Sequence, residues 1–169
     1  MRDLIGVGLA LFLGVIGIFF AYGVFGSSNS SSQVQETFLE LQQARTELQS
    51  YAIQNGGYGA AAFPFAQIRA LALLPLQALT ATATINQWKG TIALTGNGAN
   101  FFADYTNVDP TSCARLMVKT PASSGVTGIA VASSAAGLSA ATVNPLPVGA
   151  ATAAAACTGT MALRFVVAG

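Results

Sequence analysis

The clearest hydrophobic feature of the chain is an uncharged apolar run near its N-terminus. No charged residue occurs between Asp3 and Glu36, and residues 4–25 are almost entirely apolar. A helix of about 22 residues is roughly 33 Å long, which is enough to cross the hydrocarbon core of a bilayer. The pattern therefore predicts a hydrophobic helix that lies in a membrane or in another continuous apolar environment.

An amphipathic helix is predicted directly after this run. The Ser-rich stretch 26–32 is typical of a linker or of a helix N-cap. From residue 33 to about 55, apolar residues recur at helical spacing, and Gly56-Gly57 is a common C-terminal stop. The predicted apolar face consists of Val34, Phe38, Leu41, Leu48 and Ala52. We expect one long helix, either continuous or interrupted at the serines.

Shorter elements are predicted along the rest of the chain. Residues 65–79 favour a short helix limited by Pro75, and residues 112–119 favour a helix capped by Thr111. The tract 133–156 is rich in Ala, Ser, Gly and Thr, and we expect it to be an exposed loop. Strands are predicted at 88–94, 100–105, 128–132 and 161–167, with a turn at 95–98.

This order of elements predicts the α+β class, with a long N-terminal hydrophobic helix packed on a small antiparallel sheet. Two parts are expected. Residues 1–32 form the hydrophobic helix with its Ser-rich exit, and residues 33–169 form one globular head domain that includes the second half of the long helix.

The low charge of the chain bears on its partners. Charged residues make up 8% of the sequence and the net charge is +1, against about a quarter charged residues in a typical domain. This balance offers no basic field for nucleic acid, so no nucleic-acid binding is expected. A free-standing protein with so few charges dissolves poorly, whereas one covered by copies of itself does not need them. We interpret the low charge as an indication of assembly; the alternative is an Ala-rich composition without functional meaning.

The two cysteines, Cys113 and Cys157, are far apart in the sequence and form no CxxC motif. In a chain with an export-like N-terminus, such a pair is typical of one disulfide. The alternative is two buried free thiols in a cytosolic protein.

Neither a catalytic site nor a metal or cofactor site is predicted. The chain has no His, which is the commonest general base and metal ligand. Lys89 and Lys119 belong to no recognisable motif. Three carboxylates, Glu36, Glu40 and Glu47, follow one another along the long helix, and this spacing favours a solvated or interchain face over an acid pair.

An aromatic group around the first two predicted strands has two interpretations. In the first, Trp88 and Tyr105, together with Phe101 and Phe102, stack sugars on a surface used for recognition. Strand alternation favours the other interpretation, in which alternate members fill the core side of the sheet.

Several short stretches together resemble type IV pilins, most closely those of the type IVb subgroup found in thin conjugative or adhesive pili. Each stretch is weak alone, but they occur in the family's order across most of the chain. They are Tyr51 with Asn55-Gly56-Gly57-Tyr58 at the helix end, Asn86-Gln87-Trp88-Lys89-Gly90 before the first strand, Phe101 to Val108 leading to Cys113, and Ala155-Ala156-Cys157 followed by residues 161–167.

The resemblance implies roles for the N-terminal residues. Pilins carry Glu at the fifth mature position, whereas this chain has Ile5; Gly14 falls where the family usually has Gly. If Met1 is the first mature residue, Asp3 is the nearby acid that would neutralise a terminal amine of its own or a neighbouring chain, and Arg2 adds a further positive charge. In the alternative, Arg2 and Asp3 pair with each other at a membrane surface. The implied filament-core residues are Leu4, Ile5, Leu9, Phe12, Gly14, Ile16, Phe19 and Phe20.

The resemblance implies a structural protein and not an enzyme. We expect a major pilin that polymerises through its N-terminal helix into an extracellular pilus for adhesion, motility or conjugative contact. Its expected partners are identical subunits, the inner membrane before assembly, the pilus assembly machinery and a prepilin peptidase. The alternatives are a minor pilin, adhesin or pseudopilin that binds a surface ligand, and a membrane-anchored secreted domain.

Overall fold

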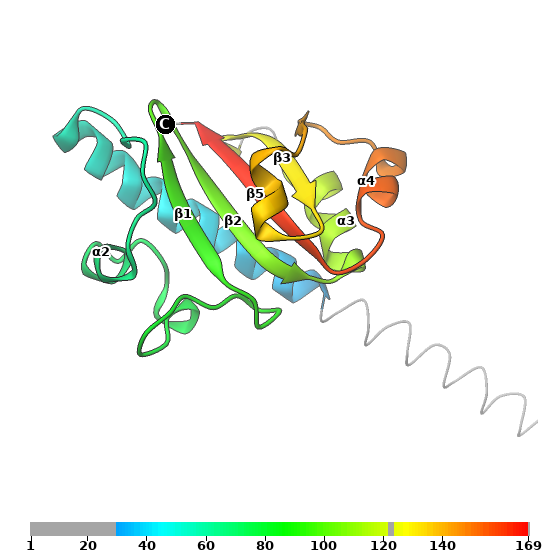
Figure 1. Ribbon diagram of the computed structural model, residues 1–169, viewed down its shortest axis with the longest axis horizontal. Coiled ribbons are helices and arrows are strands. Elements are labelled where there is room, and N and C mark those ends of the chain that lie inside the picture. The colour runs from blue at the N-terminus through cyan, green and yellow to red at the C-terminus, as the bar shows by residue number, and fades with distance from the viewer. Residues whose placement is uncertain (1–29, 122–123, 169) are drawn as a thin grey trace, which may run out of the picture.

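The computed structural model describes residues 30–121 and 124–168 of the chain. A long helix, residues 30–55 in its described part, lies across one face of a five-stranded antiparallel sheet, and this arrangement is visible in Figure 1. The strand order is β1-β2-β5-β3-β4. The predicted α+β class, with a long helix on a small antiparallel sheet, is confirmed.

The helix packs on the sheet through one stripe of its surface. Val34, Thr37, Leu41, Ala44 and Leu48 are buried at alternating spacings of four and three residues, which keeps them on one side of an α-helix. Phe38 and Ala52 are half-buried against the same core. The predicted apolar face is therefore the face that the helix buries.

The helix ends where the two glycines predict. Gly56 has a φ of +74°, a conformation that favours glycine, and the amide of Gly57 donates to the carbonyl of Ala52 at 2.9 Å. The chain then turns back along β1 (Ile92–Asn97), where Phe63 N donates to Leu94 O at 2.8 Å. This return segment covers the free edge of the first strand.

The segment between the long helix and the sheet differs from its prediction. One helix was expected over residues 65–79, but the structure has α2 (Phe65–Ala70) and a separate 3-10 turn, η1 (Leu76–Ala78). The helix stops because Ala72 adopts a φ of +50° and Pro75 cannot continue a helical hydrogen-bond ladder.

The first hairpin is shifted relative to its prediction. β1 begins at Ile92, four residues after the expected start, and it pairs with β2 (Asn100–Val108) across a tight turn at Gly98. Trp88 lies in the preceding loop. That loop is held by Asn86, whose Oδ1 accepts hydrogen bonds from Trp88 N at 3.0 Å and Gly90 N at 2.8 Å.

The helix after β2 has a different cap from the expected one. α3 (Pro110–Lys119) is capped by Asp109, whose Oδ1 accepts from Thr111 N and Ser112 N at 3.0 Å. Thr111 is therefore a donor to the cap and is not the cap itself. An Asp followed by Pro at the first helical position is a favourable N-terminus.

The Ala-rich tract contains regular structure that its composition did not predict. After β3 (Val126–Ala132) the chain forms η3 (Ala135–Ser139), β4 (Val143–Pro145) and α4 (Ala150–Ala156). Leu138 and Ala153 are buried and anchor η3 and α4. η3 lies on the face of the sheet opposite the long helix (Figure 1). The tract is thus largely exposed, as expected, but it is not a simple loop.

The last strand, β5 (Met161–Ala168), occupies the centre of the sheet between β2 and β3. Its alternate residues Leu163, Phe165 and Val167 are buried and join the core beneath the long helix. The C-terminal strand therefore joins the β1-β2 hairpin to the β3-β4 pair in one sheet.

Candidate functional site

The predicted disulfide is present and ties two helices together. Cys113 in α3 and Cys157 directly after α4 are bonded, with their Cα atoms 5.8 Å apart, and both are buried. The bond closes a sequence separation of 44 residues, and a loop of that size gains roughly 4 kcal/mol in the chain-entropy model. It therefore fixes the C-terminal end of the Ala-rich region 133–156 to α3.

The two aromatic residues proposed for surface recognition are buried. Tyr105 is fully buried and meets Phe165 edge to face at 5.6 Å, and Trp88 is 8% exposed. The recognition-surface interpretation is therefore corrected, and the core interpretation holds. Tyr105 faces the helix because alternate residues of β2 point to that side; Trp88 is buried through its loop and not through a strand.

One carboxylate of the long helix is buried beside these aromatics. Glu40 is 3% exposed, and its Oε1 accepts a hydrogen bond from Gln87 Nε2 at 2.6 Å. Burial is the main cause that raises the pKa of Glu40 from 4.5 to about 7; the hydrogen bond from Gln87 and the nearby Tyr105 hydroxyl oppose the shift, and the charge of Glu36 adds to it. Burial, followed by the neighbouring Glu40, likewise raises the pKa of Tyr105 well above 10.

This burial corrects the expectation for Glu40, which was grouped with Glu36 and Glu47 on a solvated or interchain face. Only Glu36 and Glu47 are exposed. The spacing did contain the relevant information, because Glu40 lies three residues after Thr37 and four before Ala44, both of which belong to the buried stripe.

The outward side of the long helix combines acidic and large apolar side chains. Leu39 is 65% exposed and Ile53 is 84% exposed, on the side away from the buried stripe. Glu36 and Glu47 are exposed between and beside them. We call these four residues the helix outer face. This side of the helix thus carries charged and large apolar side chains in solvent.

The remaining carboxylates are engaged within the head domain. Asp104 accepts two hydrogen bonds at 2.7 Å from Arg164, whose guanidinium lies 4.6 Å from the centre of the Phe102 ring. For Asp109, burial alone acts to raise the pKa, but hydrogen bonds from Ser112 and Thr111 outweigh it and lower the pKa. Asp104 and Asp109 therefore stabilise the head domain, the first through an ion pair and the second as a helix cap.

The described part of the chain contains neither a cluster of metal-binding side chains nor a membrane-spanning helix. Within residues 30–121 and 124–168, no group of three or more His, Cys, Asp or Glu side chains is placed to hold a metal ion. Across the same residues, no helix combines the length and apolarity needed to cross a bilayer. The predicted head group, Met1 to Asp3, and the filament-core residues from Leu4 to Phe20 lie outside the described residues.

Comparison with known proteins identifies a family and a similar solved structure. The family model described as "PilS N terminal" matches residues 31–168, which is most of the chain. A crystal structure of a type IV b pilin from Salmonella typhi is 18% identical, with 78% of this chain and 97% of that chain covered and a TM-score of 0.46. No curated protein matches the sequence.

Proposed function

Because this chain belongs to the PilS N-terminal family and is a type IVb-like pilin, we propose that it polymerises through its apolar N-terminal segment into an extracellular pilus. In this proposal it is the major subunit, and the filament consists of identical copies. The family and the fold are those of structural proteins.

The observation that carries the proposal is that the head domain completes its core without the apolar segment. The side of the sheet that faces the long helix is covered by helix residues from Val34 onwards, and Leu48, Tyr105 and Phe165 are fully buried there. Residues 4–25 therefore need an apolar environment from outside their own head domain. Lipid provides that environment before assembly, and neighbouring copies provide it afterwards.

The energetics are consistent with transfer between these two environments. The 15 large apolar side chains of residues 4–25, at roughly 1.5–3 kcal/mol each, give tens of kcal/mol for leaving water, as an upper bound. Moving from lipid into a filament core gains far less, because both environments are apolar and only packing differs. Assembly driven by a dedicated machinery, starting from subunits held in the inner membrane, fits this small difference.

Further roles follow from membership in the pilin family and belong to the same proposal. We expect a prepilin peptidase and a pilus assembly machinery as partners, and adhesion, motility or conjugative contact as uses of the filament. Asp3 is proposed to neutralise the terminal amine of its own or a neighbouring chain, because an unpaired charge in an apolar filament core is costly.

The proposal is tested by removing the gene and restoring it with variants in the natural host. Phe12→Lys places a charge in the apolar segment and should abolish filaments in electron micrographs while the head domain still forms its disulfide. Ala151→Lys, at an exposed position of α4, is the matched control and should assemble normally. Filaments formed equally well by Phe12→Lys would refute the proposal. Counting this chain in purified filaments separates a major subunit from a rare minor pilin.

A further inference from the structure

Within the described residues, the exposed carboxylates lie on one surface of the head domain, the helix outer face. Of the five carboxylate side chains in the described residues, Glu40 is buried, Asp104 pairs with Arg164, and Asp109 caps α3. The two that remain exposed, Glu36 and Glu47, both belong to the helix outer face. They are eleven residues apart, which is three helical turns, so they point the same way.

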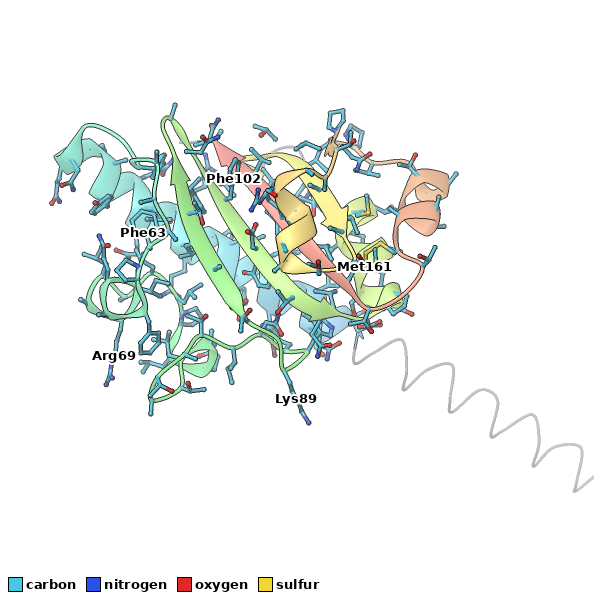
Figure 2. All side chains as sticks on the ribbon, viewed as in Figure 1. Phe63, Arg69, Lys89, Phe102 and Met161 are labelled. Carbon is cyan, nitrogen blue, oxygen red and sulfur yellow. A yellow bond between two sulfur atoms is a disulfide. The ribbon has the colours of Figure 1, made fainter. Side chains whose placement is uncertain are left out.

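A basic edge lies on a different part of the same subunit. Arg69 in α2 and Lys89 in the loop before β1 are both exposed. Figure 2 shows that the two side chains project from the same edge of the molecule. Leu76 in η1 comes between them in sequence and is 85% exposed. We call Arg69, Leu76 and Lys89 the basic edge.

The charges on these two surfaces have no ion-pair partner within the subunit as far as the structure describes it. The salt bridge found among residues 30–121 and 124–168 is that of Arg164 with Asp104. A chain with only 8% charged residues thus places two carboxylates on one surface and two cations on another, and each surface also carries a large exposed apolar side chain.

We propose that the helix outer face of one subunit docks on the basic edge of a neighbouring copy. Glu36 and Glu47 would pair with Arg69 and Lys89, while Leu39, which lies between the two carboxylates along the helix, would pack against Leu76. This inference rests on the proposed function, since the partner is a second copy within the pilus.

A second copy is the occupant that fits both surfaces at once. The two surfaces are complementary in charge and alike in apolar character, which is the arrangement expected at a specific interface. They are different parts of one molecule, so their contact is heterologous and leaves one of each surface free at the ends. Repetition of such a contact builds an open helical filament.

Charge reversal tests the pairing. Glu36→Lys with Glu47→Lys, or Arg69→Glu with Lys89→Glu, should each reduce the number of filaments at least tenfold. The chain carrying all four changes keeps its net charge and restores the attraction, and it should form filaments within about twofold of the unmodified chain. Ala151→Glu, which adds a carboxylate at an exposed position of α4, is the control and should leave assembly unchanged.

The outcomes separate this inference from the proposed function. Normal filaments in both double variants, or no recovery in the chain with four changes, would overturn the docking inference while the pilus proposal stands. An unmodified chain that forms no filaments would overturn the pilus proposal itself. If these surfaces bind membrane lipids or another protein instead of a second copy, the chain with four changes should not recover filament formation.

Cross-linking gives a test that does not depend on charge. Leu39→Cys and Leu76→Cys in the same chain should yield a ladder of linked multimers when purified filaments are oxidised. Either single variant should stay monomeric on a denaturing gel, apart from its native disulfide. Leu39→Cys combined with Ala151→Cys is the matched control. The absence of a ladder from filaments that contain Leu39→Cys and Leu76→Cys would contradict the docking.

Discussion

Gln87 Nε2 donates a hydrogen bond to Glu40 Oε1 at 2.6 Å, and this contact joins the long helix to the loop that precedes the sheet. The two residues are 47 positions apart in the sequence. Glu40 Oε2 and Gln87 Oε1 are also buried, and no group among the described residues forms a hydrogen bond with either oxygen. A buried carboxyl in such a place is held most easily in its neutral form.

Glu40→Gln should therefore make the head domain less sensitive to pH. Since the pKa of Glu40 is raised to about 7 in the folded chain, its stabilising contribution is complete below about pH 4.5 and is lost as the pH rises to about 7. The neutral Gln does not incur this loss. We expect the variant to be more stable above pH 7 by roughly 2–3 kcal/mol, and little changed near pH 4.5.

Urea unfolding of the full chain in detergent, repeated from pH 4.5 to 8, measures this effect. Glu47→Gln removes an exposed carboxyl of the same helix and serves as the control. A pH dependence of the unfolding free energy that Glu40→Gln leaves intact would show that Glu40 is not its source.

Cys113→Ala should leave the long helix and the core around Tyr105 in place but loosen α4 and the region 133–156, because the disulfide ties α3 to the end of α4. We expect a loss of about 2–5 kcal/mol in unfolding free energy and a lower yield of extracellular subunits. Protease resistance and heat stability, compared with Cys113→Ala/Cys157→Ala, measure the effect. Unchanged stability in both variants would mean that the disulfide is not a structural tie.

Gly90→Ala should destabilise the contact between the loop and the sheet. A Cβ added at Gly90 would lie 2.0 Å from the carbonyl oxygen of Thr106, so β2 or the loop would have to move. We expect a cost of at least about 2 kcal/mol, at the upper end for overpacking. Gly149→Ala is the control, since nothing lies within 4 Å of its added Cβ. Equal thermal stability of the two variants would contradict the close approach.

Asp3→Ala should reduce filament assembly without unfolding the head domain, because it removes the acid proposed to neutralise a terminal amine in the filament. Electron microscopy of the complemented deletion strain measures filament number, and disulfide formation reports on folding. Wild-type filament numbers in this variant would exclude the proposed head-group pairing.

The elements that the sequence predicted well are those set by local periodicity. The buried stripe of the long helix repeats at three and four residues, so the sequence pattern predicted that Val34, Leu41 and Leu48 lie on its buried face. The strand near the C-terminus has the period of two that marks a strand, with Leu163, Phe165 and Val167 buried. The cysteine count separately predicted the disulfide that joins Cys113 to Cys157. Sequence alone did not place β5 at the centre of the sheet, because that position depends on pairing with two distant strands.

The errors arose where long-range contacts decide the local structure. Asn86 Nδ2 donates to Thr106 O at 2.7 Å, and this contact holds Trp88 in a loop that propensity alone assigns to a strand. The tract 133–156 offers no period, because Ala fits a helix, a turn or a strand edge equally well. Glu40 was misplaced because a charged residue was expected to be solvated, although its spacing put it beside the buried stripe.

Mass spectrometry of filaments sheared from the surface of cells tests the central claim most directly. If copies of this chain form the filament through residues 4–25, this chain should be the most abundant protein in it, and its peptides should include the intact apolar segment. Filaments that lack this chain, or a surface protein whose N-terminus begins beyond Gly26, would contradict the account.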